Sequence, residues 1–204
     1  MSRELILNHP GIREFTTIWM DSLRDGAFQL VNTNKLIRFY EGATGLKTGS
    51  TDAALYCLSA TAERDGMELI AVVLKSPTSD QRFETAKSLL NFGFANYTLT
   101  DVYPSQALPP TEVLLGEKAQ VQGVLQRSSR ILIDKAELNA VTTELCLSEE
   151  VEAPVEAGQK LGEMVVLVNG EVRETIPIVA SEAVKRLNVP GIFLRFLKTL
   201  FMAG

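Results

Sequence analysis

Residues 53–74 read AALYCLSATAERDGMELIAVVL, two apolar runs on either side of a short charged segment. Both runs are β-prone, and Asp65-Gly66 between them is a strong signal for a tight hairpin. The sequence therefore predicts two antiparallel neighbouring strands, one over residues 53–62 and the other over residues 67–74.

A helix is predicted directly after this hairpin. Thr78 and Gln81 fit a capping box, in which the threonine side chain caps the first turn. A helix packed on a hairpin gives an α/β layer arrangement. Apolar residues then recur at helical spacing: Phe83, Ala86, Leu90, Phe94 and Tyr97.

The segment before the hairpin contains a short glycine-bounded stretch, Gly45-Leu46-Lys47-Thr48-Gly49, which favours an extended conformation. Further upstream, apolar residues at helical spacing predict a helix from Pro10 to roughly Met20, and Asp25-Gly26 ends it. The first 97 residues are therefore expected to combine helices with an antiparallel sheet, as part of an α/β domain.

The composition changes after Tyr97. Residues 98–111 contain three prolines, which is typical of a linker or of the entry to a new domain. Short β-prone runs then alternate with turn signals such as Asn169-Gly170, and this spacing predicts a small all-β domain, either a sandwich or a barrel. The runs are residues 121–125, 130–133, 142–147, 164–168 and 175–179.

The end of the chain has a third pattern. After Pro190-Gly191, apolar side chains cover a wide arc of a helical wheel, and Arg195 and Lys198 lie opposite. A helix of about eleven residues is roughly 16 Å long, too short to span a bilayer but long enough to lie in its interface. We expect residues 191–204 to form an amphipathic helix that binds a membrane surface. Packing of this helix on the protein's own core is the alternative.

Composition argues against several classes of function. The net charge is −5 and charges of both signs are mixed along the chain, so the basic stripe of a nucleic-acid-binding protein is not present. One histidine and two distant cysteines, Cys57 and Cys146, do not form a metal-binding pattern. The sequence predicts neither a metal nor a cofactor. Its first residues do not read as a signal peptide.

The Lys47-Thr48-Gly49 motif carries the functional interpretation. Together with the segments on either side of this motif, the chain resembles the D-alanyl-D-alanine carboxypeptidases, which are low-molecular-mass penicillin-binding proteins and serine peptidases. The resemblance covers residues 1–97 in consistent order, and the β-rich segment and tail are similar to that family's C-terminal domain and membrane anchor. The matching segments are residues 32–37 (Asn-Thr-Asn-Lys-Leu-Ile), 45–51, 56–62, 69–74, 82–83 and 89–94.

The resemblance implies a role for each residue of this motif. Lys47 is expected to place positive charge at the terminal carboxylate of a D-alanine peptide and to assist proton transfer. Thr48 is expected to donate a hydrogen bond to the same carboxylate. Gly49 has no side chain, so the peptide can lie against the strand. The catalytic expectation is therefore Lys47 together with the backbone N–H of Ser50 as one oxyanion donor.

The sequence departs from the family at the nucleophile. Members use a Ser-x-x-Lys motif and a Ser-x-Asn motif, and neither spacing occurs in these 204 residues. We therefore expect the chain to be the C-terminal portion of a serine-type D-Ala-D-Ala carboxypeptidase, without the nucleophile half. Alone it is expected to be catalytically silent. The resemblance also implies that the Ala53–Leu74 hairpin and the Phe83–Phe94 helix carry apolar faces that pack against the missing half, and these faces predict self-association through the hairpin.

The resemblance also implies a domain layout and a location. Residues 1–97 are expected to be the C-terminal part of the penicillin-recognising peptidase domain, residues 98–190 a β-rich C-terminal domain, and residues 191–204 the membrane anchor. The full-length enzyme is expected to trim the terminal D-alanine of peptidoglycan stem peptides through an acyl-enzyme, to bind β-lactams, and to act in cell-wall synthesis and cell shape. Its expected place is the extracytoplasmic face of the bacterial cell membrane.

Two other functions fit parts of the sequence. One is a non-catalytic β-rich scaffold or interaction module at the cell envelope. A biotinyl or lipoyl carrier is disfavoured because the turn at residues 168–171, Val-Asn-Gly-Glu, has no lysine. The other is a β-lactamase, which shares the Lys-Thr-Gly motif, although the β-rich extension and the tail favour the carboxypeptidase.

Overall fold

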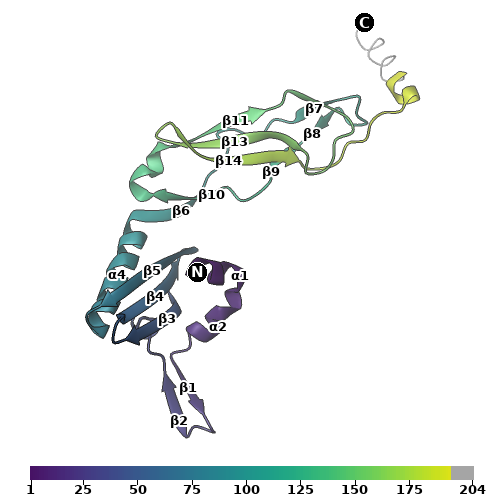
Figure 1. The fold of residues 1–204 in the computed structure, drawn as a ribbon. Helices are drawn as coiled ribbons and strands as arrows, with labels where there is room; N and C mark the ends of the chain where they lie inside the picture. Colours follow the sequence, from purple (N-terminus) through teal and green to yellow (C-terminus); the bar gives the residue numbers. More distant parts are fainter. Residues whose placement is uncertain (194–204) are drawn as a thin grey trace. The chain divides into compact units, whose positions relative to one another are not determined.

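The computed structural model describes residues 1–193 and divides the chain into two compact units, Met1–Leu99 and Thr100–Gly204 (Figure 1). The predicted amphipathic helix over residues 191–204 lies outside the described residues, apart from its first three positions. Among the described residues, no helix has the length and apolar character needed to cross a lipid bilayer.

A three-stranded antiparallel sheet in the order β3-β4-β5 forms the centre of the first unit. Its strands are β3 (Ala43–Thr51), β4 (Leu55–Arg64) and β5 (Met67–Ser76). The predicted hairpin is confirmed, since Asp65 and Gly66 form the turn with φ values of 51° and 76°. Positive φ at both central residues is what a type I′ turn requires.

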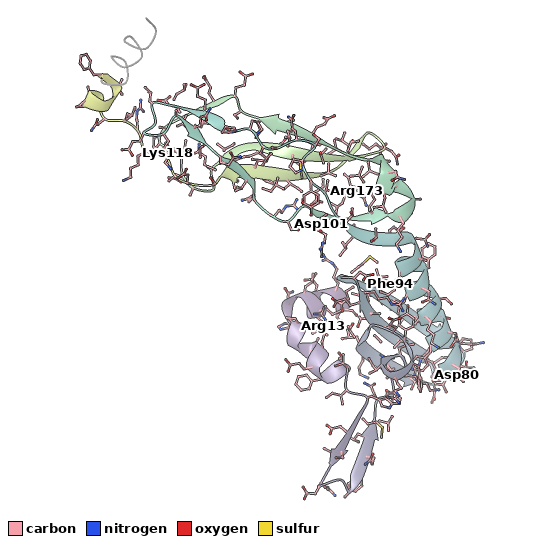
Figure 2. The ribbon with its side chains drawn as sticks, turned by 180° about the vertical axis from the view of Figure 1, so that it is seen from behind. Arg13, Asp80, Phe94, Asp101, Lys118 and Arg173 are labelled. Atoms are coloured by element: carbon pink, nitrogen blue, oxygen red, sulfur yellow. The ribbon has the colours of Figure 1, made fainter. Side chains whose placement is uncertain are left out.

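Helix α4 (Ser79–Asn96) covers one face of this sheet (Figure 1), and Asp80 and Phe94 mark its two ends in Figure 2. The predicted N-cap is confirmed, because the hydroxyl of Thr78 accepts a hydrogen bond from the backbone N–H of Gln81 at 3.2 Å. Tyr97, predicted as the last apolar position of the helix, instead begins β6 (Tyr97–Asp101). The core between helix and sheet consists of Leu36, Leu58, Ala60, Ala62, Met67, Ala71, Val73, Phe83, Ala86, Leu90 and Phe94.

The N-terminal part differs from the prediction. In place of one helix from Pro10 to Met20, the chain forms two short helical segments, preceded by a third at residues 2–8 and followed by a hairpin with exposed residues throughout. The helical pattern fails because it has no buried face: Phe15 is 70% exposed and Ile18 42%. The backbone is instead tied across the hairpin base, where the Asn32 N–H donates to the Trp19 carbonyl at 2.8 Å. The segments are α1 (Ser2–Asn8), η1 (Pro10–Ile12), α2 (Arg13–Thr16), β1 (Met20–Leu23) and β2 (Phe28–Val31).

The buried side chain of Asn34 ties the segment before β3 to the start of that strand. Its Nδ2 donates to the Gly45 carbonyl at 2.9 Å, and its Oδ1 accepts from the Leu36 N–H, at the start of α3 (Leu36–Phe39), at 3.2 Å. The hydroxyl of Thr16 donates to the Thr44 carbonyl at 2.6 Å. An ion pair between Arg13 of α2 (labelled in Figure 2) and Glu68 of β5 joins the helical segment to the sheet. The first two contacts hold the start of β3, and the ion pair attaches α2 to β5.

As the sequence predicts, the second unit is a β domain up to residue 188, interrupted only by the short helical segment η2 (Lys135–Ala140); residues 189–193, the last described residues, are helical. Its largest sheet has the order β11-β13-β14-β9, a second has the order β12-β7-β8, and β10 pairs with β6. Each of the five predicted β-prone runs overlaps a strand. The strands are β7 (Thr111–Leu114), β8 (Gln120–Val121), β9 (Gly123–Leu125), β10 (Arg130–Asp134), β11 (Val141–Leu147), β12 (Glu150–Glu152), β13 (Lys160–Val168) and β14 (Glu171–Ala180).

Two apolar clusters stabilise the second unit. One surrounds Met164 and Ile176, which face each other across β13 and β14, and the other surrounds Val113 and Leu161. Near the start of the unit, Arg130 donates two hydrogen bonds to the Asp101 carboxylate, at 3.1 and 3.2 Å. These bonds hold the pKa of Asp101 below its usual range. An exposed ion pair of this kind contributes little to stability, so the stability of the second unit depends mainly on the two apolar clusters.

Replacing Asn34 with alanine should destabilise the first unit. The change leaves the Gly45 carbonyl and the Leu36 N–H without their buried partner, a loss of about 1–3 kcal/mol. Urea unfolding followed by the fluorescence of Trp19, the only tryptophan in the sequence, measures it. Asn8→Ala, which removes only an exposed contact with Glu4, is the control and should cost less than about 0.5 kcal/mol. Equal unfolding midpoints for the two variants would contradict this account.

Candidate functional site

The motif predicted to bind a carboxylate lies on β3, an outer strand of the described sheet. Lys47, Gly49 and Ser50 are exposed, and Thr48 is half-buried. Side chains alternate along a strand, and directly opposite residues share a face. Lys47 and Gly49 therefore lie on the face opposite to the buried side chain of Leu58, which pairs with Thr48.

Lys47 and Thr48 place a cation and a hydroxyl on consecutive residues. The Nζ of Lys47 donates to the Thr48 carbonyl at 2.5 Å. The Oγ1 of Thr48 lies 2.7 Å from the Oγ1 of Thr33, and either hydroxyl can donate. An ammonium and a hydroxyl donor at adjacent positions are suited to a carboxylate, because charge-assisted hydrogen bonds to such a group are strong.

The space above Gly49 is open. A Cβ built on this residue meets no heavy atom within 4 Å, and its φ is not in the left-handed region. Gly45, on the same strand, is different: a Cβ there would lie 3.0–3.2 Å from Thr16 and Thr61. Packing explains a glycine at position 45, whereas neither packing nor a left-handed φ explains a glycine at position 49. The open surface at Gly49 is therefore available to an extended ligand.

Arg82, in the first turn of α4, contacts the backbone near the C-terminal end of β3. Its exposed fraction is only 6%. Its Nη1 donates to the Cys57 carbonyl at 3.2 Å and to the Gly49 carbonyl at 3.5 Å. The guanidinium also lies over the ring of Phe83, 4.7 Å from its centroid. In the described part of the chain its Nε has no hydrogen-bond partner.

The sequence alone gives Thr33, Asn34 and Arg82 no role, although all three lie in segments that carry the family resemblance. Arg82 could have been noticed, because it shares a helical stripe with Ala86 and Leu90, at i+4 and i+8, both of which are buried. The 2.7 Å contact between Thr33 and Thr48 joins residues fifteen positions apart and has no local signal.

Comparison with known proteins assigns the two parts of the chain. Residues 1–78 match the family model described as D-alanyl-D-alanine carboxypeptidase, and residues 97–186 match the C-terminal domain of penicillin-binding protein 5. The chain is 36% identical to D-alanyl-D-alanine carboxypeptidase DacF of Bacillus subtilis over 97% of its own length and 51% of that protein. It is 32% identical to DacC of Escherichia coli over 69% of its length and 36% of that protein.

The fold agrees with this assignment. The crystal structure of penicillin binding protein 5 from Haemophilus influenzae superimposes with a TM-score of 0.73 at 25% identity, covering 91% of this chain and 54% of that one. The chain thus spans about half, or less, of the length of these relatives. It belongs to the D-alanyl-D-alanine carboxypeptidase family of penicillin-binding proteins.

Proposed function

We propose that β3 of this chain is the carboxylate-binding strand of a serine-type D-Ala-D-Ala carboxypeptidase. The observation that carries this proposal is the exposed Lys47 next to the half-buried Thr48, beside the open surface of Gly49 on an outer strand. A peptide that ends in D-alanine would lie along β3 by strand addition. Its terminal carboxylate would accept hydrogen bonds from the Lys47 ammonium and the Thr48 hydroxyl.

The neighbouring groups support these roles. The Lys47 ammonium now donates to the Thr48 carbonyl, a neutral acceptor that a charged carboxylate can replace. If Thr33 donates its proton to Thr48, the Thr48 proton is free to point to the ligand. The N–H of Ser50 would then stabilise the oxyanion at the scissile carbonyl, a contribution of about 3 kcal/mol for one such donor.

The chemistry that we propose is acyl transfer. A serine hydroxyl attacks the carbonyl of the penultimate D-alanine, the C–N bond breaks, and the terminal D-alanine leaves with a proton on its amine. Water then hydrolyses the acyl-enzyme. These 204 residues contain no Ser-x-x-Lys motif, so we propose that the serine and its base come from polypeptide outside this chain. The same full-length enzyme would bind β-lactams at this serine.

The parts of the chain take roles that follow from this proposal. Residues 1–97 would supply the Lys-Thr-Gly part of the peptidase domain, and residues 98–190 a supporting β-rich domain. Residues 191–204 would attach the chain to the membrane, on the extracytoplasmic side where peptidoglycan stem peptides are found. Both family-model matches and the amphipathic pattern of the tail support this layout.

Gly49→Ala should weaken peptide binding without destabilising the fold. The methyl group has free space in the protein, but it occupies the surface along which the peptide would lie. Fluorescence anisotropy with a labelled peptide ending in D-Ala-D-Ala should show an affinity loss of about tenfold or more, which is about 1.4 kcal/mol. Gly11→Ala is the matched control, because a Cβ at Gly11 also meets nothing within 4 Å. Unchanged affinity in Gly49→Ala would refute the placement of the peptide on β3.

The chain on its own should form no covalent adduct with penicillin. Acylation requires a serine oxygen activated by a nearby base, and the motif that supplies both is not in this sequence. Incubation of the purified chain with fluorescent penicillin, followed by denaturing electrophoresis, should give no labelled band. A labelled band that disappears after denaturation before incubation would show that this chain has its own nucleophile.

The chain on its own should also associate with itself. All eight strand residues of the β1–β2 hairpin are exposed. Five of them are large apolar residues that are each about half exposed, between 47% and 54%: Met20, Leu23, Phe28, Leu30 and Val31. Apolar surface of this kind, next to unpaired strand edges, favours pairing with another copy. Light scattering should give a mass above that of the 22.4 kDa monomer. A monomer across the concentration range would contradict this expectation.

A further inference from the structure

The Gly49–Ser50 peptide group connects Arg82 to the proposed oxyanion donor. The carbonyl of this group belongs to Gly49 and accepts from Arg82 Nη1 at 3.5 Å. Its N–H belongs to Ser50. A peptide group is planar, and its C=O and N–H point in opposite directions. A donor that fixes the direction of the Gly49 carbonyl therefore fixes the direction of the Ser50 N–H as well.

Arg82 holds two strands at this point. Its Nη1 also donates to the Cys57 carbonyl at 3.2 Å, and Cys57 is the cross-strand partner of Gly49 in the β3–β4 pairing. The Gly49 carbonyl is thereby directed to the side of β4 and α4. The Ser50 N–H then points away from β4, to the outer edge of β3, where no strand of the described sheet pairs with it.

The burial of Arg82 gives this contact its strength. The side chain is 6% exposed, and none of the ion pairs in the described part of the chain involves it. Its charge therefore acts on the backbone carbonyls and aromatic rings around it. A cationic donor polarises the amide whose carbonyl it contacts, and a polarised amide is a stronger N–H donor.

We propose that Arg82 is a positioning residue that orients and polarises the Gly49–Ser50 peptide, so that the Ser50 N–H is ready to bind an oxyanion. The inference rests on the proposed function, since it assigns Ser50 the role of oxyanion donor. Arg82 acts through the peptide group and needs no contact with the reacting atoms.

Arg64 is a matched control in the same unit. Its Nε and Nη2 also donate to a backbone carbonyl, that of Glu41, at 3.2 and 3.1 Å. Its guanidinium also lies over aromatic rings, those of Tyr40 and Phe94. Arg64 is half-buried, and its loss removes the same kind of contact from a different strand end. The Arg64 variant therefore reports the general effect of losing an arginine that binds a backbone carbonyl in this unit.

The test is NMR spectroscopy of the full chain labelled with ¹³C and ¹⁵N. In Arg82→Met the carbonyl carbon of Gly49 and the amide proton of Ser50 should both shift upfield, because the polarising donor is lost. In Arg64→Met both resonances should stay in place. If Arg82→Met does not fold, the same measurement is made on Arg82→Lys, in which a smaller upfield shift of the same two resonances is expected. Unmoved resonances in the Arg82 variant that folds, or equal shifts in Arg64→Met, overturn the inference.

A titration of the wild-type chain with N-acetyl-D-alanine separates this inference from the proposed function. Ligand-induced shifts at the Lys47 and Thr48 amides, combined with a Ser50 resonance that Arg82→Met leaves unmoved, overturn the inference and leave the proposed function standing. If the ligand shifts neither the Lys47 nor the Thr48 amide resonance, the proposed function is wrong, and the role of Arg82 at an oxyanion site is wrong with it. Shifts in both experiments support both.

Discussion

The register between β3 and β4 is the constraint on which the first unit depends. Leu58 and Ala60 of β4 are buried under α4, and they lie opposite Thr48 and Leu46 of β3. Because side chains alternate, this register places Lys47 on the other face, where it is exposed. A slip of one residue would exchange the faces and bring the lysine to the apolar core. The packing of the core therefore decides which side chains the outer strand presents.

Much of this arrangement could be predicted from the sequence because it depends on local signals. Asp65-Gly66 determines the hairpin turn, Thr78 caps α4, and the apolar stripe from Phe83 to Phe94 gives the helix its buried face. The position of Lys47-Thr48-Gly49 on a strand follows from the same pattern. The β-prone runs of the second unit were recognisable for the same reason, since their inward residues include Ile131, Met164 and Ile176.

The parts that could not be predicted depend on contacts between distant residues. Phe15 and Ile18 have helical spacing, but the segment that contains them ends in a hairpin because Trp19 is tied to Asn32. The contact between Thr33 and Thr48 lies next to the hydrogen bond by which Asn34 attaches the same segment to the Gly45 carbonyl. In the sequence, Arg82 is only a polar residue within a predicted helix. Its hydrogen bond to the Gly49 carbonyl is seen only in the structure. In each case the deciding hydrogen bond joins residues at least eleven positions apart, and the spacing of residues along the sequence does not indicate such a bond.

In the structure α4 buries the back of the strand, and Asn34 and Arg82 donate hydrogen bonds to its backbone carbonyls. We propose that β3 presents a carboxylate site at its outer edge. The most direct test is the position of a bound ligand on the full chain. With N-acetyl-D-alanine, the account predicts intermolecular nuclear Overhauser effects between the ligand methyl groups and the Gly49 α-protons, and none with N-acetyl-L-alanine at the same concentration. Contacts with the D-enantiomer elsewhere on the chain, or equal contacts for both enantiomers at Gly49, would contradict it.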